Sequence, residues 1–153
     1  MPRTYKNCRA LSDTVGGMKF DTKIAVLLRD DLATWQRLNV TAFLVSGVAA
    51  NDPALIGEPY ADADGTAYLP MFRQPVMVYA GDAVVLTQAH ERALERGLAI
   101  TVFTEELFKT GDDVDNRAAV AAVPRAELNL VGIALHGPRS VVDKICKGAA
   151  LHP

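Results

Sequence analysis

Cysteine and histidine are scarce in this chain. Two cysteines and three histidines occur among 153 residues. Cys8 and Cys146 stand far apart and the histidines are scattered singly, whereas zinc sites and redox pairs place such residues at short, fixed spacings. We therefore expect no metal and no cofactor, and we expect the thiols to be reduced in a cytoplasmic protein.

An excess of positive charge and long apolar runs are also missing. The formal net charge is −2, so no overall positive field attracts nucleic acid or an anionic membrane surface. No apolar run reaches the roughly 18 residues that a membrane-spanning helix needs, and the N-terminus has no apolar signal core. The sequence thus predicts a protein that stays in the cytoplasm and does not bind membrane, and its overall charge does not favour nucleic acid as a partner, although a local basic patch stays open.

The common glycine-rich and catalytic signatures are absent as well. The sequence contains no Gly-x-Gly-x-x-Gly, Walker loop, Gly-x-Ser-x-Gly or His-Glu-x-x-His motif. Half of the residues are hydrophobic, and the chain is long enough for one domain with a sizeable core. Polar residues without a clear period predict an extension over residues 1–22, ahead of a single α/β domain over residues 23–153.

Residues 23–50 contain the clearest pattern. The apolar run Ile24–Leu28 predicts a strand that is buried on both faces. After the charged corner Arg29–Asp31 the period becomes helical, with Asp30 or Asp31 suited to cap the first turn. The predicted inward stripe of this helix is Trp35, Leu38, Ala42, Val45 and Ala49. A strand that leads into a helix is the first half of a βαβ unit, and ligands bind beyond the carboxyl ends of such strands.

A β-hairpin is predicted before the second strand of the domain. Asp64-Gly65 lies between Tyr60 and Ala67–Leu69, and glycine readily supplies the positive φ that a tight hairpin turn needs. The alternative is a calcium loop, because Asp62 and Asp64 alternate as hard ligands do. The later carboxylates and the closing glutamate of the EF-hand are missing, so we favour the turn.

The next residues predict a strand, a helix and a strand, with the short connections that a parallel crossover uses. The strands are Pro75–Tyr79 and Leu98–Phe103, and the helix between them opens at Gly81-Asp82 and ends at Gly97. His90 falls on the side of this helix that we expect to face water.

The segment Thr104–Pro124 is rich in carboxylates. Glu105 and Glu106 lie on a short predicted helical turn, which a loop and a short alanine-rich helix follow. Adjacent carboxylates in a cleft can differ in pKa and serve as general acid and base. A solvated turn is the alternative.

A last strand and helix close the chain. Leu128–Leu135 predicts the strand, and Gly137-Pro138 starts a helix whose apolar side includes Cys146. Because Cys146 lies among core positions, we expect it to pack in the interior and not to act as a nucleophile.

Two blocks of the chain resemble the type-two, archaeal-type peptidyl-tRNA hydrolases. Lys23–Leu32 resembles their opening strand and Arg-x-Asp-Leu corner, and Leu128–Leu151 resembles their closing strand, Gly-Pro turn and final helix. A closer resemblance, over residues 20–153, is to a bacterial family called domain of unknown function 2000. It rests on the segments RDDLATWQRLNVTAFLVSG, EPYADADGTAYLPMFRQPV and TEELFKTGDDVDNRAAVAAVP.

These resemblances imply a three-layer α/β/α sandwich of the peptidyl-tRNA hydrolase type, with a small mixed, mostly parallel sheet. They also imply a homodimer. A homodimer would suit the first helix, because Val40, Phe43, Leu44 and Val48 make it apolar on sides beyond the predicted stripe.

The functional residues of the hydrolases are largely missing here. Their Gly-Lys pair after the corner and the glutamine and histidine of the first helix have no counterparts, and Arg37 is the nearest cation. Thr104-Glu105-Glu106 replaces their Asp-x-Gly-x-Thr after the third strand. Only Arg29 and Asp31 carry over, and both have a structural alternative within the corner.

Three functions remain open. The first is a hydrolase or transferase with Asp31 or Glu105 as base and with Arg29 or Arg37 holding an anionic group. The second is a non-catalytic protein that binds a small polar ligand or a partner peptide, and the third is residual peptidyl-tRNA hydrolysis. The expected substrate-binding residues are Arg29, Trp35, Arg37, Asn39, Tyr68, Gln74 and Thr104. For Trp35, Asn39 and Gln74 the alternative is a buried polar group satisfied by the backbone of the corner.

Overall fold

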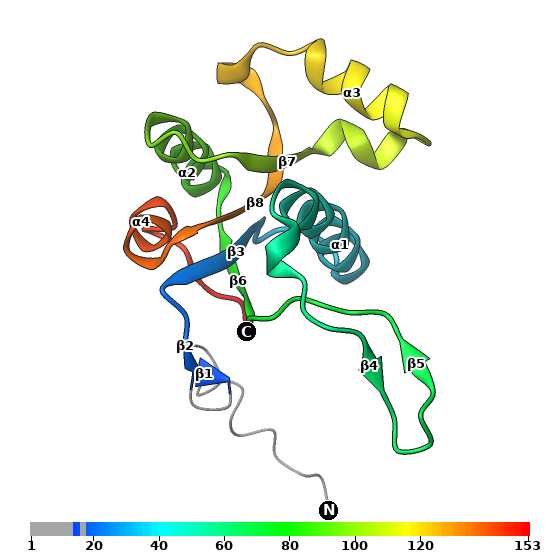
Figure 1. Cartoon of the computed structure of the whole chain (residues 1–153). Coiled ribbons are helices and arrows are strands. Elements are labelled where there is room, and N and C mark those ends of the chain that lie inside the picture. The colour runs from blue at the N-terminus through cyan, green and yellow to red at the C-terminus, as the bar shows by residue number, and fades with distance from the viewer. Residues whose placement is uncertain (1–13, 16–17) are drawn as a thin grey trace, which may run out of the picture.

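A five-stranded sheet forms the centre of the molecule (Figure 1). The computed structural model describes residues 14–15 and 18–153. The order of the strands in the sheet is β7-β8-β3-β6-β9. Their bounds are β3 Thr22–Arg29, β6 Val76–Gly81, β7 Ile100–Thr104, β8 Leu130–Pro138 and β9 Ala150–Leu151. Two further pairs of short strands, β1 (Thr14–Val15) with β2 (Met18–Lys19) and β4 (Tyr60–Ala61) with β5 (Ala67–Tyr68), lie outside this sheet.

Helices complete a mixed α/β fold. The α-helices of the described chain are α1 (Thr34–Asn51), α2 (Ala83–Glu95), α3 (Asp113–Ala121) and α4 (Arg139–Ile145). Three short 3₁₀ helices connect them to the strands: η1 (Pro53–Leu55), η2 (Glu105–Lys109) and η3 (Arg125–Glu127). None of the helices in the described residues is long and apolar enough to cross a membrane. Of the predicted extension, residues 1–13 and 16–17 lie outside the described residues.

Strand β3 is buried on both faces, as its sequence predicts. Ile24, Val26 and Leu28 pack in a cluster with the buried side of α1, whereas Ala25 and Leu27 pack in a second cluster with α2 and α4. All five side chains are at most 2% exposed. Burying a large aliphatic side chain contributes about 1.5–3 kcal/mol, so the buried side chains of β3 contribute strongly to the stability of the core.

The expectation of a mostly parallel sheet is wrong. Only β3 and β6 pair in parallel, whereas the β3–β8, β7–β8 and β6–β9 pairs are antiparallel. The predicted crossover exists, and β7 runs in the same direction as β6. However, β3 and β8 lie between these two strands. The hydrophobic pattern of each strand indicates that it is buried, but it does not identify the neighbouring strands.

Helix α1 faces the sheet with a different side from the predicted one. Its buried residues are Val40, Leu44 and Val48, whereas Trp35 and Leu38 of the predicted stripe are 60% and 69% exposed. The reason lies in β8, where Gly132 has no side chain. A Cβ atom there would lie 2.7 Å from Val40 Cγ1 and 2.9 Å from Leu44 Cδ1. The glycine therefore leaves the space into which these two side chains of α1 pack.

The predicted aspartate cap of α1 is also absent. The residue before the helix is Ala33, and the side-chain oxygen of Gln36 accepts a hydrogen bond from its backbone N–H at 2.9 Å. This is the glutamine half of a capping box, which satisfies a free N–H at the helix start. The carboxylates of Asp30 and Asp31 are therefore not used as caps.

The β4–β5 hairpin extends away from the body of the protein (Figure 1). Asp62 Oδ1 accepts hydrogen bonds from the backbone N–H groups of Asp64 and Thr66, and Gly65 has a φ of +81°. Asp62 Oδ2 accepts a hydrogen bond from the Tyr68 hydroxyl at 2.7 Å. Both carboxylate oxygens thus stabilise a turn, which confirms the hairpin interpretation over the calcium loop.

Helix α2 begins and ends as predicted, but its exposed side was assigned wrongly. Asp82 caps the helix by accepting a hydrogen bond from Val85 N at 2.9 Å, and Gly97 follows the helix with a φ of +68°. His90, expected to face water, is only 6% exposed. The segment that leads into β8 covers this side of α2, which an isolated helical pattern does not reveal.

Cys146 is buried at the end of α4, as expected. It is 6% exposed and belongs to the cluster beneath α2 and α4. Burial raises the pKa of its thiol to about 11. The thiol is therefore protonated near neutral pH, which fits a packing role and not a nucleophile.

Candidate functional site

Arg29 organises a cluster of polar side chains at one end of the sheet. It is the last residue of β3, and its side chain is only 12% exposed. Its Nε donates to Asp31 Oδ1 at 2.6 Å, its Nη1 to Asn129 Oδ1 at 2.9 Å and its Nη2 to Glu105 Oε2 at 3.1 Å. We call Arg29, Asp31, Glu105 and Asn129 the strand-end cluster.

The order of the strands explains why these residues meet. Glu105 directly follows β7 and Asn129 directly precedes β8, and β8 lies between β7 and β3. Glu105 Oε2 accepts a second hydrogen bond from Asn129 Nδ2 at 2.8 Å, and the backbone N–H of Glu105 donates to the carbonyl oxygen of Asn129 at 3.0 Å. The cluster therefore joins the ends of three adjacent strands.

The cluster carries one guanidinium and two carboxylates, so its net charge is −1. Burial disfavours the charged form of Arg29, but its hydrogen bonds to Asp31 and Glu105 outweigh this effect and raise the pKa of Arg29. The carboxylates are far more accessible, since the side chains of Asp31 and Glu105 are 63% and 49% exposed. Asp31 Oδ2 and Glu105 Oε1 form no hydrogen bond with the described residues and remain open to a ligand.

Arg37 holds the backbone of the same corner. Its Nε donates to the carbonyl oxygen of Leu32 at 2.8 Å, and its Nη2 donates to that of Asp30 at 2.9 Å. Its Nη1 lies 3.0 Å from His152 Nε2 near the C-terminus. All three nitrogens of this second arginine are thus engaged within the protein.

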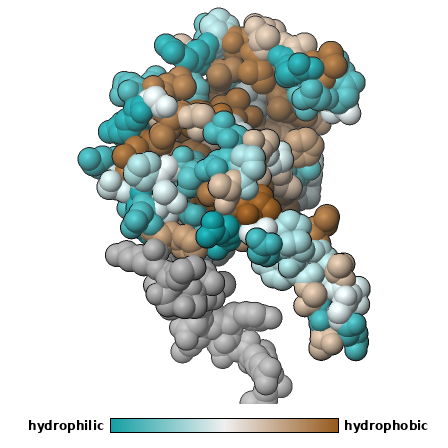
Figure 2. All heavy atoms as spheres, viewed as in Figure 1, coloured by the Kyte–Doolittle hydropathy of each residue, from teal (hydrophilic) through white to brown (hydrophobic). Residues whose placement is uncertain are grey.

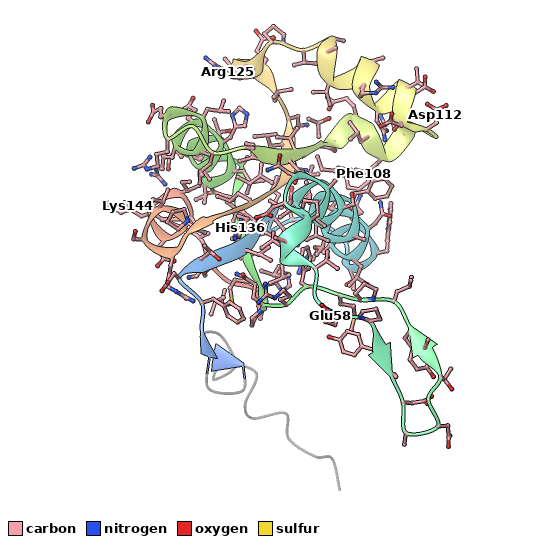
Figure 3. All side chains as sticks on the ribbon, in the orientation of Figure 1. Glu58, Phe108, Asp112, Arg125, His136 and Lys144 are labelled. Carbon is pink, nitrogen blue, oxygen red and sulfur yellow. The ribbon has the colours of Figure 1, made fainter. Side chains whose placement is uncertain are left out.

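Two aromatic rings flank the corner. Trp35 lies in the first turn of α1 and is 60% exposed, and its ring forms a T-shaped contact with the Phe108 ring at a centroid distance of 5.7 Å. Phe108 lies on η2, three residues after Glu105, and in turn contacts Phe103 at 5.1 Å. Figure 3 shows Phe108 between η2 and α1. The segments that carry the two carboxylates therefore also carry an exposed aromatic surface.

The remaining predicted site residues do not join the cluster. Gln74 lies at the opposite end of β3, where it exchanges hydrogen bonds with Thr22. Tyr68 lies in the hairpin and donates to Asp62. Asn39 is exposed on α1, and Thr104 is 1% exposed with a hydroxyl that has no partner among the described residues.

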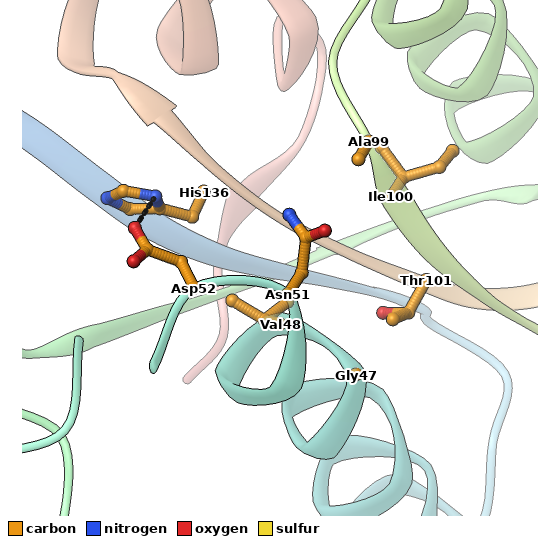
Figure 4. A pocket seen from close by; sticks show the side chains of 8 residues that line it. All are labelled: Gly47, Val48, Asn51, Asp52, Ala99, Ile100, Thr101 and His136. Atoms are coloured by element: carbon orange, nitrogen blue, oxygen red, sulfur yellow. Dashed lines mark ion pairs between the residues drawn. The ribbon is translucent and has the colours of Figure 1, made fainter. Parts of the chain in front are cut away.

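A small pocket at the end of α1 contains a histidine that the sequence reasoning did not select (Figure 4). Its volume is about 190 Å³, and it is lined by the last turn of α1, by β7 and by His136 of β8. His136 Nδ1 lies 3.8 Å from Asp52 Oδ2, and Nε2 is enclosed without a partner in the described chain. The pocket offers no activated nucleophile, because the Thr101 hydroxyl already donates to the carbonyl oxygen of Leu44 at 2.9 Å.

Metal binding receives no support from the described residues. They contain no group of three or more histidine, cysteine, aspartate or glutamate side chains that could hold an ion. The chemistry available at the strand ends is therefore that of carboxylates, an amide and aromatic rings.

Comparisons with known proteins agree with the fold and leave the activity open. The family model described as "Protein of unknown function (DUF2000)" matches residues 22–153. The structure of a protein of unknown function, Atu0240 from Agrobacterium tumefaciens str. C58, is similar to this chain with 50% sequence identity and a TM-score of 0.86. The match covers 88% of this chain and 99% of that one. No curated protein matches the chain.

Proposed function

The chain belongs to the DUF2000 family, and we propose that it binds a small polar ligand with a positively charged group at the strand-end cluster. One observation carries this proposal. Every guanidinium nitrogen of Arg29 is occupied within the protein, whereas Asp31 and Glu105 each present one unoccupied carboxylate oxygen at the surface. The exposed part of the cluster is therefore negative and accepts hydrogen bonds.

An anionic substrate fits this arrangement less well. It would have to displace internal hydrogen bonds of Arg29 or Arg37, the two cations of the corner. Hydrogen bonds that involve a charged group contribute about 1.5–3 kcal/mol each, so their loss would offset much of the binding energy. A cationic or hydrogen-bond-donating group meets the free oxygens without disrupting either arginine.

The aromatic surface supports the same ligand class. A cation above an exposed aromatic ring gains about 0.5–1 kcal/mol, and tryptophan is the strongest ring for this interaction. Trp35 is exposed in the first turn of α1, four residues after Asp31. An amine or guanidinium bound at the carboxylates would therefore have an aromatic ring on a neighbouring segment.

A hydrolase or transferase is the second candidate. Each carboxylate is anchored to Arg29 through one oxygen and keeps the other free, which is the geometry of a positioned general base. In this proposal Asp31 or Glu105 accepts the proton of a nucleophile, and the ligand described above is the substrate. Turnover that Asp31→Ala abolishes while affinity for the substrate persists would favour this candidate over a binding protein.

We also propose a relationship to the peptidyl-tRNA hydrolases, first in the fold and then in the activity. Packing of α1 on one side of β3, and of α2 and α4 on the other, supports a three-layer α/β/α sandwich. Residual hydrolysis of peptidyl-tRNA has weaker support, since a phosphate backbone requires free cations and Arg29 and Arg37 are engaged. Release of amino acid from an N-blocked aminoacyl-tRNA by the purified protein, with Asp31→Ala alongside, tests it.

A homodimer and a cytoplasmic location are further proposals. Leu38 and Phe43 of α1 are 69% and 54% exposed, and an apolar groove of about 460 Å³ lies between α1, β7 and α3. Figure 2 shows apolar side chains, in brown, gathered in the region beside α3. A second copy that covers this surface would remove it from water. The cytoplasmic location rests on the wide spacing of Cys8 and Cys146.

A thermal-shift screen tests the ligand class. Putrescine, choline and agmatine are compared with acetate and inorganic phosphate at equal ionic strength. A ligand at 100 times its Kd adds about 2.7 kcal/mol of stability, so cationic probes should raise the Tm. Glu105→Gln should reduce the increase, whereas Glu58→Gln, which removes an exposed carboxylate in the segment before β4, should preserve it. Stabilisation by the anions alone would contradict the proposal.

A further inference from the structure

Another cavity lies on the α2 side of the sheet and uses none of the side chains of the strand-end cluster. It has a volume of about 510 Å³ and lies between α2 and the segment from η3 into β8. Thr87, His90, Glu91 and Glu95 line it from α2, where their spacing places them on one side of the helix. Arg125 lines it from η3, and Figure 3 shows Arg125 on the segment that connects α3 to β8. We call this cavity the α2 pocket.

His90 is the first sign that the α2 pocket binds a ligand. The residue is 6% exposed, yet its ring forms no hydrogen bond with any described residue. In the described residues, the fully enclosed polar side-chain atoms without a partner are the Thr104 hydroxyl and His136 Nε2. The two ring nitrogens of His90 are not fully enclosed. The polar edge of the imidazole therefore still reaches the cavity. The ring is mostly buried and has no partner among the described residues, so its accessible edge is available for a hydrogen bond to a ligand in the cavity.

Arg125 is the second sign. Its guanidinium forms no hydrogen bond and no ion pair within the described chain, although Glu91 and Glu95 line the same cavity. Burial lowers the pKa of His90, and the charge of Arg125 lowers it further, so Arg125 is close enough to act on the ring. A neutral imidazole thus surrounds one cavity together with a cation and two carboxylates that have no ion pair among the described residues.

We propose that the α2 pocket binds a small amino acid with an apolar side chain, as a zwitterion. The ligand carboxylate accepts hydrogen bonds from Arg125 and His90, and the ligand ammonium meets Glu91 and Glu95. Leu94 and Leu128, which also line the pocket, contact the apolar side chain. A zwitterion fits because Arg125, Glu91 and Glu95 line the same cavity, and none of them forms an ion pair with another described residue.

The volume agrees with a ligand of this size. The α2 pocket, at about 510 Å³, lies within the range of about 300–1,000 Å³ that is typical of small-molecule sites and is large enough to hold one amino acid. The Thr87 hydroxyl offers an additional donor or acceptor on the wall of the cavity.

Leucine and two blocked forms of it test the proposal on the full-length protein. N-acetylleucine retains only the carboxylate, and leucine amide retains only the ammonium. The readout is the NMR signal of His90 Hε1 in protein with labelled histidine, assigned with His90→Gln. Leucine should shift this signal in a saturable manner, and both blocked forms should bind at least tenfold more weakly.

Arg125→Gln should weaken the leucine-dependent shift at least tenfold. Arg117→Gln is the matched control, because Arg117 is an exposed arginine of α3 that pairs with Asp113. Both substitutions are at the surface, so the fold should persist. Equal binding of leucine and N-acetylleucine would show that the ammonium group is not recognised, and it would overturn the proposal of a zwitterion site. No shift with any of the three probes, or a shift that survives Arg125→Gln, would overturn the proposal.

Discussion

Arg29 Nη2 donates a hydrogen bond to Glu105 Oε2 over 3.1 Å, and this contact joins the last residue of β3 to the residue that follows β7. Asn129, which directly precedes the intervening strand β8, hydrogen bonds to both side chains. A polar cluster that ties three strand ends together has both a structural and a binding consequence, and the two are separable by mutation.

Replacing Arg29 by methionine removes three hydrogen bonds and leaves two carboxylates without their cation. Because the partners are half exposed, solvent compensates part of the loss, and we expect the free energy of unfolding to fall by about 1–3 kcal/mol. Urea unfolding measures it. The control is Arg117→Met, which breaks a largely exposed i,i+4 pair on α3 and should cost about 0.3–0.5 kcal/mol. Equal effects of the two substitutions would show that the strand-end cluster adds no stability.

The start of α1 depends on Gln36 and not on an aspartate. Gln36→Ala removes the acceptor for Ala33 N–H and should lower the free energy of unfolding by about 0.5–1 kcal/mol. Asp31→Asn keeps an oxygen for Arg29 and should change it by less than about 0.5 kcal/mol. Thermal unfolding of both variants makes the comparison. A larger loss for Asp31→Asn than for Gln36→Ala would mean that Asp31 serves the corner's structure.

Of the two glycines in β8, Gly132 is predicted to tolerate substitution less well than Gly137. In Gly132→Ala the new methyl group would lie within 3 Å of side-chain atoms of Val40 and Leu44. Such overpacking costs about 1–3 kcal/mol, and α1 would have to move away from the sheet. Gly111→Ala is the control, since nothing lies within 4 Å of its added Cβ. A Gly132→Ala protein with unchanged stability would contradict the packing of α1 described above.

Stability should decrease on acidification because of His90. Burial and the charge of Arg125 lower its folded pKa below the ordinary value of 6.5, and the opposing charge of Glu91 does not cancel this decrease. As the pH falls through 6.5, the unfolded chain binds a proton that the folded protein does not, so the free energy of unfolding falls until the folded pKa is reached. Urea unfolding between pH 7 and pH 5 tests this, with His90→Gln as the variant that should lack this part of the decrease.

Arg125→Gln provides an independent check of the same linkage. Removal of the nearby positive charge should raise the folded pKa of His90 towards its ordinary value, and the acid-dependent loss of stability should become smaller. An Arg125→Gln protein with the same or a steeper pH dependence would contradict the stated position of Arg125.

The main elements could be predicted from the sequence because their signals are local. Ile24–Leu28 is continuously apolar, Asp82 and Gly97 bracket α2, and Asp64-Gly65 fits a tight turn. These signals depend on backbone conformation and on the period of a single segment. The neighbours of each strand depend on contacts across the whole chain, and the insertion of β8 between β3 and β7 was therefore missed.

The same distinction applies to the candidate sites. Arg29, Asp31 and Glu105 were expected together because they follow the carboxyl ends of strands that run in the same direction. The rule does not predict Asn129, because this residue precedes the amino end of an antiparallel strand and the rule concerns residues that follow the carboxyl ends of strands. His90 was misjudged because η3 and the start of β8 cover its side of α2, and this contact has no signature in the helix itself.

The fluorescence of Trp35 gives the most direct test of ligand binding at the strand-end cluster. Trp35 is the single tryptophan of the chain, so its emission reports on this corner alone. Agmatine would be titrated into the wild-type protein and into Asp31→Asn, Glu105→Gln and Glu58→Gln. We predict a saturable change in emission for the wild type and Glu58→Gln, and at least fivefold weaker binding for the other two. An emission that agmatine leaves unchanged, or changes equally in all four proteins, would contradict a cation-binding site at the strand ends.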